Sequence, residues 1–535
     1  MKILPREDWT YLKLIRQRAT EYGERIFCTF ENGDTLTFSQ FEDTSNIMAS
    51  ALAKLGVLPG DRIIGLMHND KAFLLTMLAV QKRGAIFVPV NTELKGSFLE
   101  HQIRNIQPRI VFVNDELRPA FDTIATEDLG IETTVSIEGC ESPLPQTNGK
   151  SFSQLLETYA RPVDVIEASP NDICMIMFTS GTTGPSKGTL MPHAHCLLFG
   201  FGSGRALCMT PSDKMFICMP FFHAMGLLLQ LTSCLIYGST AHVIRRFSAS
   251  SWLEDIRSSE ATLTYGLGVI PEFIFRQTPT PYDKDHKLRT MLAVPIGNDW
   301  AKAFEIRFGI RLLQAYGMTE CNIPAYGKLE DPILVGCAGH IEEDFFEVRI
   351  VNPDTDKELT IGSIGEIVVR PKEPFCFMAG YYQMAERTVE AWRNLWFHTG
   401  DAGKFDHQGR LYFIDRIKDC IRRRGENISA YEVEQVLNNH PEVVESCVIG
   451  VRDHDAGGEE NVKAFIVPSS ESLAYTIVLD WCVQQMPRYA VPRYIEYVQK
   501  LDKTPTGKLM KQGLREKCNT LHTWDRESFG YVLTR

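Results

Sequence analysis

The 535-residue sequence lacks the long apolar runs that a membrane-spanning helix requires. No stretch approaches about 18 consecutive apolar residues. Charged residues and a proline at Pro5–Asp8 interrupt the N-terminal segment, so we expect no signal peptide. Positive charge is also not in excess, because 67 Asp and Glu outnumber 56 Lys and Arg and give a net charge of −11. Because neutralising phosphates needs a basic surface, we expect no nucleic acid among the partners.

Paired cysteine motifs are also missing. The 14 cysteines are scattered along the chain, and none forms a C-x-x-C pair. We therefore expect reduced, buried thiols in a cytoplasmic protein. His193, His195 and Cys196 stand close together, but no fourth ligand follows at a useful spacing, so we expect no zinc site there.

Strand-length apolar runs alternate with helix-like segments through the first three quarters of the chain. This alternation predicts an α/β fold of layered sheets and helices. A charged stretch begins near residue 416, and the segments beyond it are sufficient for a small α+β domain. We therefore expect an N-terminal domain at 1–415 and a C-terminal domain at 416–535. The expected strands are 173–178, 214–219, 241–244, 444–451 and 462–467, and the expected helices are 224–236, 248–260, 430–438 and 475–485.

The strongest local motif is TSGTTGPSKG at residues 179–188, directly after the first of these strands. Its glycines let the backbone turn tightly, and successive N–H groups in such a loop can surround an anion. Lys187 adds a positive charge, so a triphosphate is the natural ligand. The loop is not a Walker A motif, because Ser186 stands where that motif has its second glycine. On this motif alone, a flexible surface loop is the alternative.

Further motifs follow in order along the chain: PFFHAMG (220–226), QAYGMTE (314–320), GEIVVR (365–370), GYY (380–382), WFHTGD (396–401), RIKDCIRRRGENIS (416–429) and TPTGKLMK (504–511). With the phosphate loop, they make the chain resemble the adenylate-forming superfamily of acyl-CoA synthetases, adenylation domains and beetle luciferases. The resemblance runs from about residue 10 to about residue 515. It implies a large N-terminal domain and a small, mobile C-terminal domain.

The resemblance assigns catalytic roles to four residues of three motifs. Glu320 is the Mg²⁺ ligand, since a carboxylate beside a triphosphate is a hard oxygen donor. Lys508 bridges the carboxylate and the α-phosphate as negative charge develops between them. Thr319 and Lys187 complete the catalytic set. The implied ATP- or AMP-binding residues are Thr179, Ser180, Gly181, Thr182, Thr183, Gly184, Tyr316, Gly317, Met318, Asp401 and Arg416.

The resemblance also implies where the acid and the thiol bind. The expected acyl pocket consists of His223, Met225, Tyr265, Gly266, Ala315, Cys321 and Asn322. Gly266 is expected to leave room for the substrate, and Tyr265 to offer an aromatic wall. The expected coenzyme A side consists of Arg424, Gly425 and Glu426, and Lys418 falls at the hinge position.

The implied reaction is ATP-dependent ligation of an acid to coenzyme A through an acyl-AMP, with Mg²⁺. In motif detail the chain looks most like crotonobetaine/carnitine-CoA ligases, which suggests a small or medium organic acid of that type. The alternatives are an adenylation enzyme that loads a carrier-protein phosphopantetheine, a luciferase-type oxygenase and a non-catalytic nucleotide sensor. Intact Lys508 and Glu320 argue against the sensor. The oligomeric state is left open, with a homodimer among the alternatives.

Overall fold

The computed structural model describes the chain apart from residues 1–4, 125–128, 140–142, 159–164, 180–185, 268–269, 295, 297–299, 418–419, 424–425, 453–459, 471, 487, 489, 504–508, 532 and 534–535. Two compact units can be distinguished. Unit 1 comprises Met1–Ile333, Gly339–Glu347 and Arg370–Arg393, and unit 2 comprises Leu334–Ala338, Val348–Val369 and Asn394–Arg535. Unit 2 therefore includes residues on the N-terminal side of the domain boundary expected at 415/416.

The first sheet of unit 1 has eight strands in the order β20-β9-β8-β4-β3-β5-β6-β7. The strands from β8 to β7 run parallel, and β9 and β20 are added antiparallel at one edge. The expected strand at 173–178 is confirmed as β8. The bounds are β3 Arg62–Leu66, β4 Ile86–Pro89, β5 Ile110–Val113, β6 Thr133–Ser136, β7 Asn148–Ser151, β8 Ile173–Thr179, β9 Lys187–Pro192 and β20 Gly380–Tyr381.

The second sheet of unit 1 has seven strands in the order β14-β13-β12-β10-β11-β1-β2. All neighbours are parallel except the edge strand β2. The expected strands at 214–219 and 241–244 are confirmed as β10 and β11. The bounds are β1 Ile26–Phe30, β2 Thr35–Thr37, β10 Lys214–Ile217, β11 Thr240–Val243, β12 Leu263–Leu267, β13 Thr290–Val294 and β14 Arg311–Leu313. Three antiparallel strands follow, β15 Ala315–Met318, β16 Asn322–Tyr326 and β17 Cys337–Ile341.

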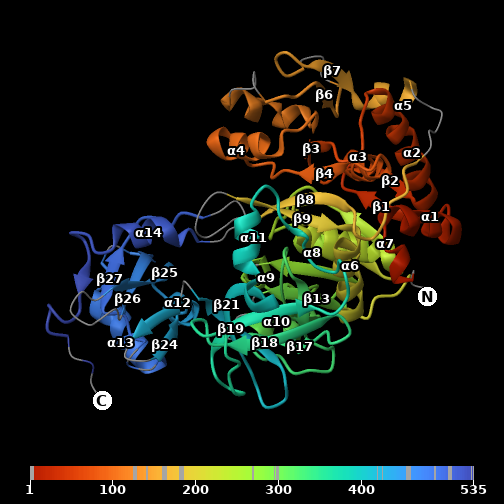
Figure 1. The fold of residues 1–535 in the computed structure, drawn as a ribbon. Helices are drawn as coiled ribbons and strands as arrows, with labels where there is room; N and C mark the ends of the chain where they lie inside the picture. Colours follow the sequence, from red (N-terminus) through yellow and green to blue (C-terminus); the bar gives the residue numbers. More distant parts are fainter. Residues whose placement is uncertain are drawn as a thin grey trace. The chain divides into compact units, whose positions relative to one another are not determined.

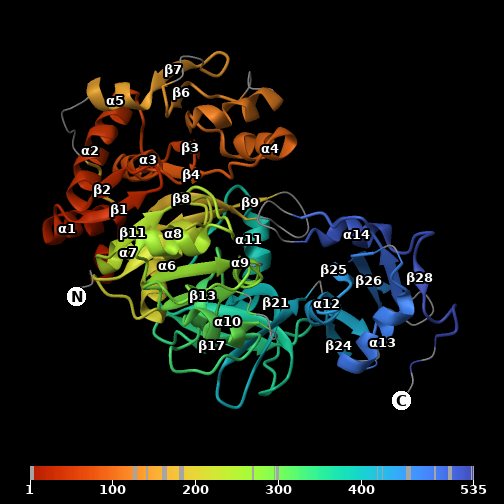
Figure 2. The same cartoon turned by 180° about the vertical axis from the view of Figure 1, so that it is seen from behind.

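Helices pack on these sheets, and α2 and α3 lie side by side in both views (Figures 1 and 2). The expected single helix at 224–236 is instead a π-helix at Met225–Leu231 that continues into α7. The α-helices of unit 1 are α1 Tyr11–Tyr22, α2 Phe38–Lys54, α3 Lys71–Lys82, α4 Gly96–Ile106, α5 Phe152–Thr158, α6 His193–Ala206, α7 Thr232–Tyr237, α8 Trp252–Ser259, α9 Ile270–Phe275, α10 Ala301–Phe308 and α11 Ala385–Ala391.

Unit 2 contains three groups of paired strands. Strands β22-β21-β19-β18 are neighbours, and β23 pairs with β24. The last sheet has the order β25-β26-β27-β28 and packs with α12 and α13 around a hydrophobic core. The bounds are β18 Phe346–Val351, β19 Gly365–Pro371, β21 Phe397–Phe405, β22 Leu411–Arg416, β23 Cys420–Arg423, β24 Glu426–Ser429, β25 Val443–Arg452, β26 Glu460–Pro468, β27 Tyr494–Tyr497, β28 Trp524–Asp525, α12 Ala430–Asn438, α13 Tyr475–Gln485 and α14 Lys511–Lys517. The predicted fold class is thereby confirmed.

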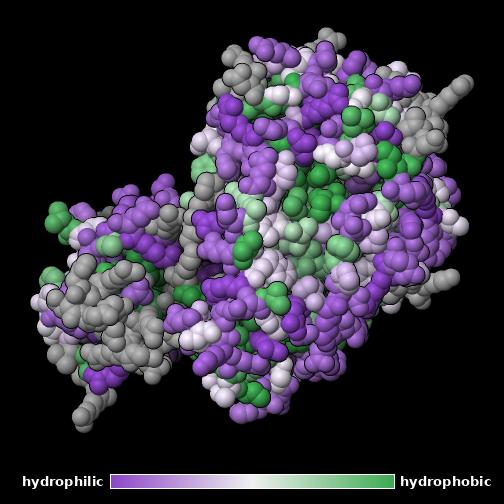
Figure 3. All heavy atoms as spheres, viewed as in Figure 1, coloured by the Kyte–Doolittle hydropathy of each residue, from purple (hydrophilic) through white to green (hydrophobic). Residues whose placement is uncertain are grey.

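Hydrophilic side chains cover most of the face drawn in Figure 3, with smaller hydrophobic groups between them. Among the described residues, no helix is long and apolar enough to span a bilayer.

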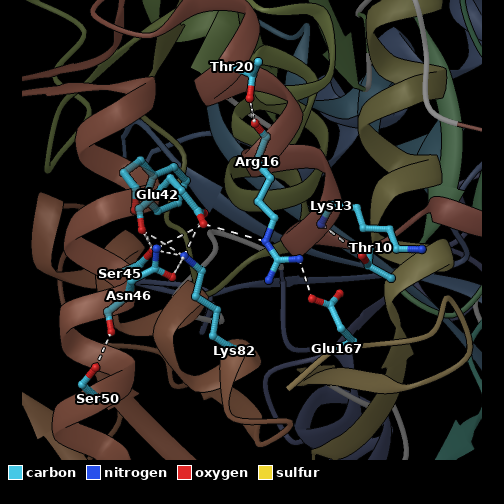
Figure 4. Close-up of polar contacts among 11 residues, drawn as sticks. Thr10, Lys13, Arg16, Thr20, Glu42, Ser45, Asn46, Ser50, Lys82 and Glu167 are labelled. Carbon is cyan, nitrogen blue, oxygen red and sulfur yellow. Dashed lines mark hydrogen bonds and ion pairs between the residues drawn. The ribbon is translucent and has the colours of Figure 1, made fainter. Parts of the chain in front are cut away.

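One lysine is fully buried where α2 packs on α3. Lys82 is 0 % exposed, and its Nζ donates to Glu42 Oε2 at 2.8 Å, Ser45 Oγ at 2.8 Å and Asn46 Oδ1 at 2.6 Å (Figure 4). Burial lowers the pKa of Lys82 to about 8, and the nearby Glu42 carboxylate opposes that change. The network therefore joins two helices of unit 1 through one ammonium group.

Candidate functional site

Glu320 lies in the turn between β15 and β16 and is 5 % exposed. The Thr179 hydroxyl donates to Glu320 Oε1 at 3.4 Å, and the Tyr381 hydroxyl donates to the same oxygen at 3.1 Å. Three elements far apart in the sequence therefore meet at one carboxylate. Among the described residues, the other oxygen of Glu320 accepts no hydrogen bond.

The backbone beside Glu320 is also held in place. His195 on α6 donates from Nε2 to the Thr319 carbonyl at 2.9 Å, and the Met378 N–H donates to the Glu320 carbonyl at 3.1 Å. Asn322 donates from its amide to His195 Nδ1 at 3.2 Å and to the His195 carbonyl at 3.0 Å. These contacts fix the tautomer of the ring with the proton on Nε2.

Burial lowers the pKa of His195 to about 4, although hydrogen bonds to two backbone carbonyls oppose that change. The ring is 0 % exposed and is therefore neutral near pH 7. Phe377 stacks on it with ring centroids 6.2 Å apart, and Phe199 contacts it at 5.0 Å. His195 is thus a packed, neutral hydrogen-bond donor to the Thr319–Glu320 turn.

The two ends of the phosphate loop lie opposite each other in the sheet. Thr179 at the end of β8 is the cross-strand partner of Lys187 at the start of β9. The Lys187 ammonium lies 4.0 Å from the centroid of the Tyr381 ring, a cation–π contact. Since Thr179 also bonds to Glu320, the loop begins beside the carboxylate predicted to bind a metal, and Lys187 at its other end contacts Tyr381.

The chemistry of these donors fits Mg²⁺. This cation is usually held by one or two carboxylates together with substrate phosphates and water, and not by an all-protein cage. Glu320 supplies the carboxylate, with one oxygen fixed by two hydroxyls. Among the described residues, no group of three or more His, Cys, Asp or Glu side chains is arranged to hold a metal ion.

In unit 2, Asp401 and Arg416 face each other across the β21–β22 hairpin. Arg416 Nε lies 2.8 Å from Asp401 Oδ1, and Asp401 is 2 % exposed. The turn before Asp401 is fixed by Glu366, which accepts from the Gly400 N–H at 3.1 Å and contacts His398 Nδ1 at 2.8 Å. A buried carboxylate on a rigid hairpin can accept hydrogen bonds from vicinal hydroxyls.

The structure fills the space that Gly266 was expected to leave for substrate. A Cβ built on Gly266 would lie 2.5 Å from Pro271 Cγ and 3.2 Å from Met291 Sδ. This glycine therefore permits close packing of α9 against β12. Tyr265 is 1 % exposed and its hydroxyl bonds to Ser203, so it offers no open aromatic wall, which corrects that expectation too.

The other predicted pocket residues differ in exposure. His223 is partly exposed, and Met225 begins the π-helix and is also partly exposed; burial lowers the pKa of His223. Ala315 begins β15 and is partly buried. Cys321 and Asn322 are fully buried, and the Asn322 amide is engaged by His195.

Several predicted site residues lie outside the part of the chain that the structure describes. Glu426 begins β24, while those outside the described residues are Ser180, Gly181, Thr182, Thr183, Gly184, Lys418, Arg424, Gly425 and Lys508. The predicted Tyr316, Gly317 and Met318 form β15, which leads into the Glu320 turn.

Two residues of the site were not predicted from the sequence. Tyr381 belongs to the GYY motif, but its contact with Glu320 depends on β20 pairing with β9, about 190 positions earlier. His195 was considered only as a zinc ligand. No local pattern in the sequence predicts either contact.

Known proteins are similar to this chain over most of its length. Residues 15–382 match the model of the family described as AMP-binding enzyme, and residues 432–508 match the AMP-binding enzyme C-terminal domain. The crotonobetaine/carnitine–CoA ligase of Salmonella typhi is 29% identical over 508 residues, which cover 92% of this chain and 96% of that protein. The corresponding ligase of Citrobacter koseri is 28% identical over 512 residues, with 93% and 97% covered.

Solved structures show the same fold. ATP-bound MatB from Rhodopseudomonas palustris aligns with a TM-score of 0.82 at 25% identity, over 95% of this chain and 98% of that chain. The o-succinylbenzoate CoA synthetase MenE from Bacillus subtilis, in complex with its acyl-adenylate OSB-AMP, aligns with a TM-score of 0.80 at 25% identity, over 95% and 98%.

Proposed function

The chain belongs to the family of AMP-binding enzymes as an AMP-forming acid–thiol ligase, and we propose that its acid is a small or medium carboxylate of the crotonobetaine or carnitine type. The carboxylate attacks the α-phosphorus of ATP, giving acyl-AMP and pyrophosphate. The thiol of coenzyme A then attacks the acyl carbon and AMP leaves. The near full-length similarity to crotonobetaine/carnitine–CoA ligases supports the proposed substrate class.

The observation that carries the adenylation step is the convergence of Thr179 and Tyr381 on Glu320, with the Lys187 ammonium over the Tyr381 ring. Glu320 would hold Mg²⁺, which supplies positive charge to the phosphates when bound. The Lys187 ammonium, at the end of the phosphate loop, adds a second positive charge. Charge placed in advance where negative charge develops lowers the barrier of such a step.

We assign the ribose contacts to Asp401. Its carboxylate would accept hydrogen bonds from the ribose hydroxyls, and Arg416 would hold the carboxylate in orientation through the 2.8 Å ion pair. The buried position of Asp401 supports this role, since a buried carboxylate needs donors to offset its desolvation.

The remaining roles rest on motif position. Lys508 would bridge the attacking carboxylate and the α-phosphate, and Lys418 would be the hinge between the adenylating and thioester-forming poses. Arg424, Gly425 and Glu426 would lie along the coenzyme A path. Because Tyr265 is buried, a trimethylammonium group would instead meet the partly exposed rings of Phe222 and His223, whose centroids lie 5.5 Å apart.

A pyrophosphate-release screen tests the proposal. The full-length protein is given ATP, Mg²⁺ and single acids, including crotonobetaine, carnitine, malonate and benzoate, with and without coenzyme A. We expect the fastest release with a quaternary-ammonium acid and formation of the matching acyl-CoA. Faster release with malonate or benzoate would refute the substrate class. Transfer only to a phosphopantetheinylated carrier protein would favour the carrier-loading alternative.

A further inference from the structure

Tyr381 occupies a fixed position at the edge of the first sheet of unit 1. It is 6 % exposed, and β20 pairs with β9 so that Tyr381 stands opposite Thr189. Its N–H donates to Thr388 Oγ1 at 2.9 Å. Because side chains two positions apart on a strand share a face, Lys187 lies on the same face as Thr189 and hence beside Tyr381. The backbone therefore sets where this phenol ring lies.

The Tyr381 side chain contacts two charged groups with two different parts. The hydroxyl donates to Glu320 Oε1 at 3.1 Å, and the ring lies 4.0 Å from the Lys187 ammonium. One side chain thus engages the carboxylate through its tip and the ammonium through its ring.

The same segment holds Glu320 a second time. The Met378 N–H, three residues before Tyr381, donates to the Glu320 carbonyl at 3.1 Å. Both the backbone and the carboxylate of Glu320 are therefore fixed by residues 378–381. A tyrosine that served packing alone would not need its hydroxyl on this particular carboxylate.

We propose that Tyr381 is a positioning residue for the adenylation step, which orients the Glu320 carboxylate toward Mg²⁺–ATP and carries the Lys187 ammonium. The inference rests on the proposed role of Glu320 as the Mg²⁺ ligand. A hydrogen bond to one oxygen of a metal-binding carboxylate fixes the orientation of the other, and loss of such a contact typically weakens metal affinity or activity about 10- to 100-fold.

Binding measurements on Tyr381→Phe test this proposal, since the variant keeps the ring over Lys187 and loses only the hydroxyl. Isothermal titration calorimetry gives the Kd of ATP once with Mg²⁺ and once with EDTA. We expect the metal-free Kd to be unchanged and the tightening by Mg²⁺ to fall about 10-fold or more. Adenylation should fall in parallel, while supplied acyl-AMP still reacts with coenzyme A.

Tyr382→Phe is the matched control. Tyr382 packs against the hydrophobic cluster around Ile103 and Ile176, so loss of its hydroxyl should leave both Kd values unchanged. Glu320→Gln should lose the tightening by Mg²⁺. The metal-free Kd reports whether each variant is folded.

The outcomes distinguish the role of Tyr381 from the metal-binding role of Glu320. If Tyr381→Phe keeps the full Mg²⁺ effect while Glu320→Gln loses it, the role of Tyr381 is wrong and the proposed function stands. If Glu320→Gln also keeps it, the metal role of Glu320 and the role of Tyr381 both fail. An equal loss in Tyr382→Phe would likewise overturn the assignment, because the effect would then not depend on the hydroxyl that contacts Glu320.

Discussion

Replacement of His195 by phenylalanine should destabilise the chain and change how its stability depends on pH. The buried site must accommodate a phenyl ring that is larger than the imidazole, and the hydrogen bonds of the imidazole nitrogens disappear. The Thr319 carbonyl loses its donor at 2.9 Å, and the Asn322 amide loses its ring acceptor at 3.2 Å. Losing buried partners costs about 1–3 kcal/mol each, so we expect a loss of about 2–4 kcal/mol near pH 7.

The pH dependence follows from the pKa of His195, which burial lowers to about 4 in the folded chain. The value in an unfolded chain is about 6.5, and a gap of about 2.5 corresponds to about 3 kcal/mol. Between these two values the unfolded chain binds the proton and the folded chain does not. The free energy of unfolding of the natural protein should therefore fall by about 3 kcal/mol as the pH drops from 6.5 to 4. His195→Phe lacks this contribution.

Urea unfolding at pH 7, 5.5 and 4.5 measures both effects. We expect the stability difference between the natural protein and His195→Phe to narrow steadily toward low pH. Thr232→Val is the control, since it removes a buried hydroxyl that bonds to Tyr11 at 2.7 Å, and the pKa of Tyr11 lies far above the pH range of the experiment. Its stability difference should stay constant with pH. A constant difference for His195→Phe as well would refute the assignment of a neutral, buried His195.

Three further predictions concern other parts of the chain. Lys508→Ala should lower acyl-AMP formation by on the order of a hundredfold or more, while supplied acyl-AMP still reacts with coenzyme A; normal pyrophosphate release would contradict this. Asp401→Asn, which removes the charge facing Arg416, should raise the KM for ATP with little change in the KM for the acid, and equal rises would argue against a ribose contact. The pKa of Lys82 is lowered to about 8 in the folded chain, whereas the unfolded chain keeps the proton up to about pH 10.5. The free energy of unfolding of the natural protein should therefore rise by about 3 kcal/mol between pH 8 and 10.5. Urea unfolding should show no such rise for Lys82→Met. An identical rise in the variant would contradict the lowered pKa of Lys82.

Elements with a clear local pattern were predicted well from the sequence. The helices at 430–438 and 475–485 have the predicted bounds, and the strand before the phosphate loop differs by one residue. The pattern of apolar residues in such segments is sufficient to predict their secondary structure from the sequence. By contrast, the first part of the expected helix at 224–236 is a π-helix that continues into α7, because an apolar run gives no sign of its exact hydrogen-bond register.

Sequence patterns did not predict the long-range contacts of the site. Glu320 and Lys187 could be named from motifs, but β20 is a two-residue strand with no periodicity, so its pairing with β9 could not be foreseen. Gly266 was expected to leave empty space, yet a glycine in a strand does not reveal what fills that space. Here Pro271 of the following helix does so.

The surroundings of Glu320 explain why these unpredicted contacts matter. A carboxylate that is 5 % exposed is costly to bury unless donors surround it. Thr179 and Tyr381 supply two donors, and both bond to the same oxygen. These two donors therefore stabilise the buried charge through one oxygen, and the proposed Mg²⁺ would bind the other. A motif can specify that a glutamate is present, but only the convergence of β8, β20 and the β15–β16 turn determines which of its oxygens would be left for the proposed Mg²⁺.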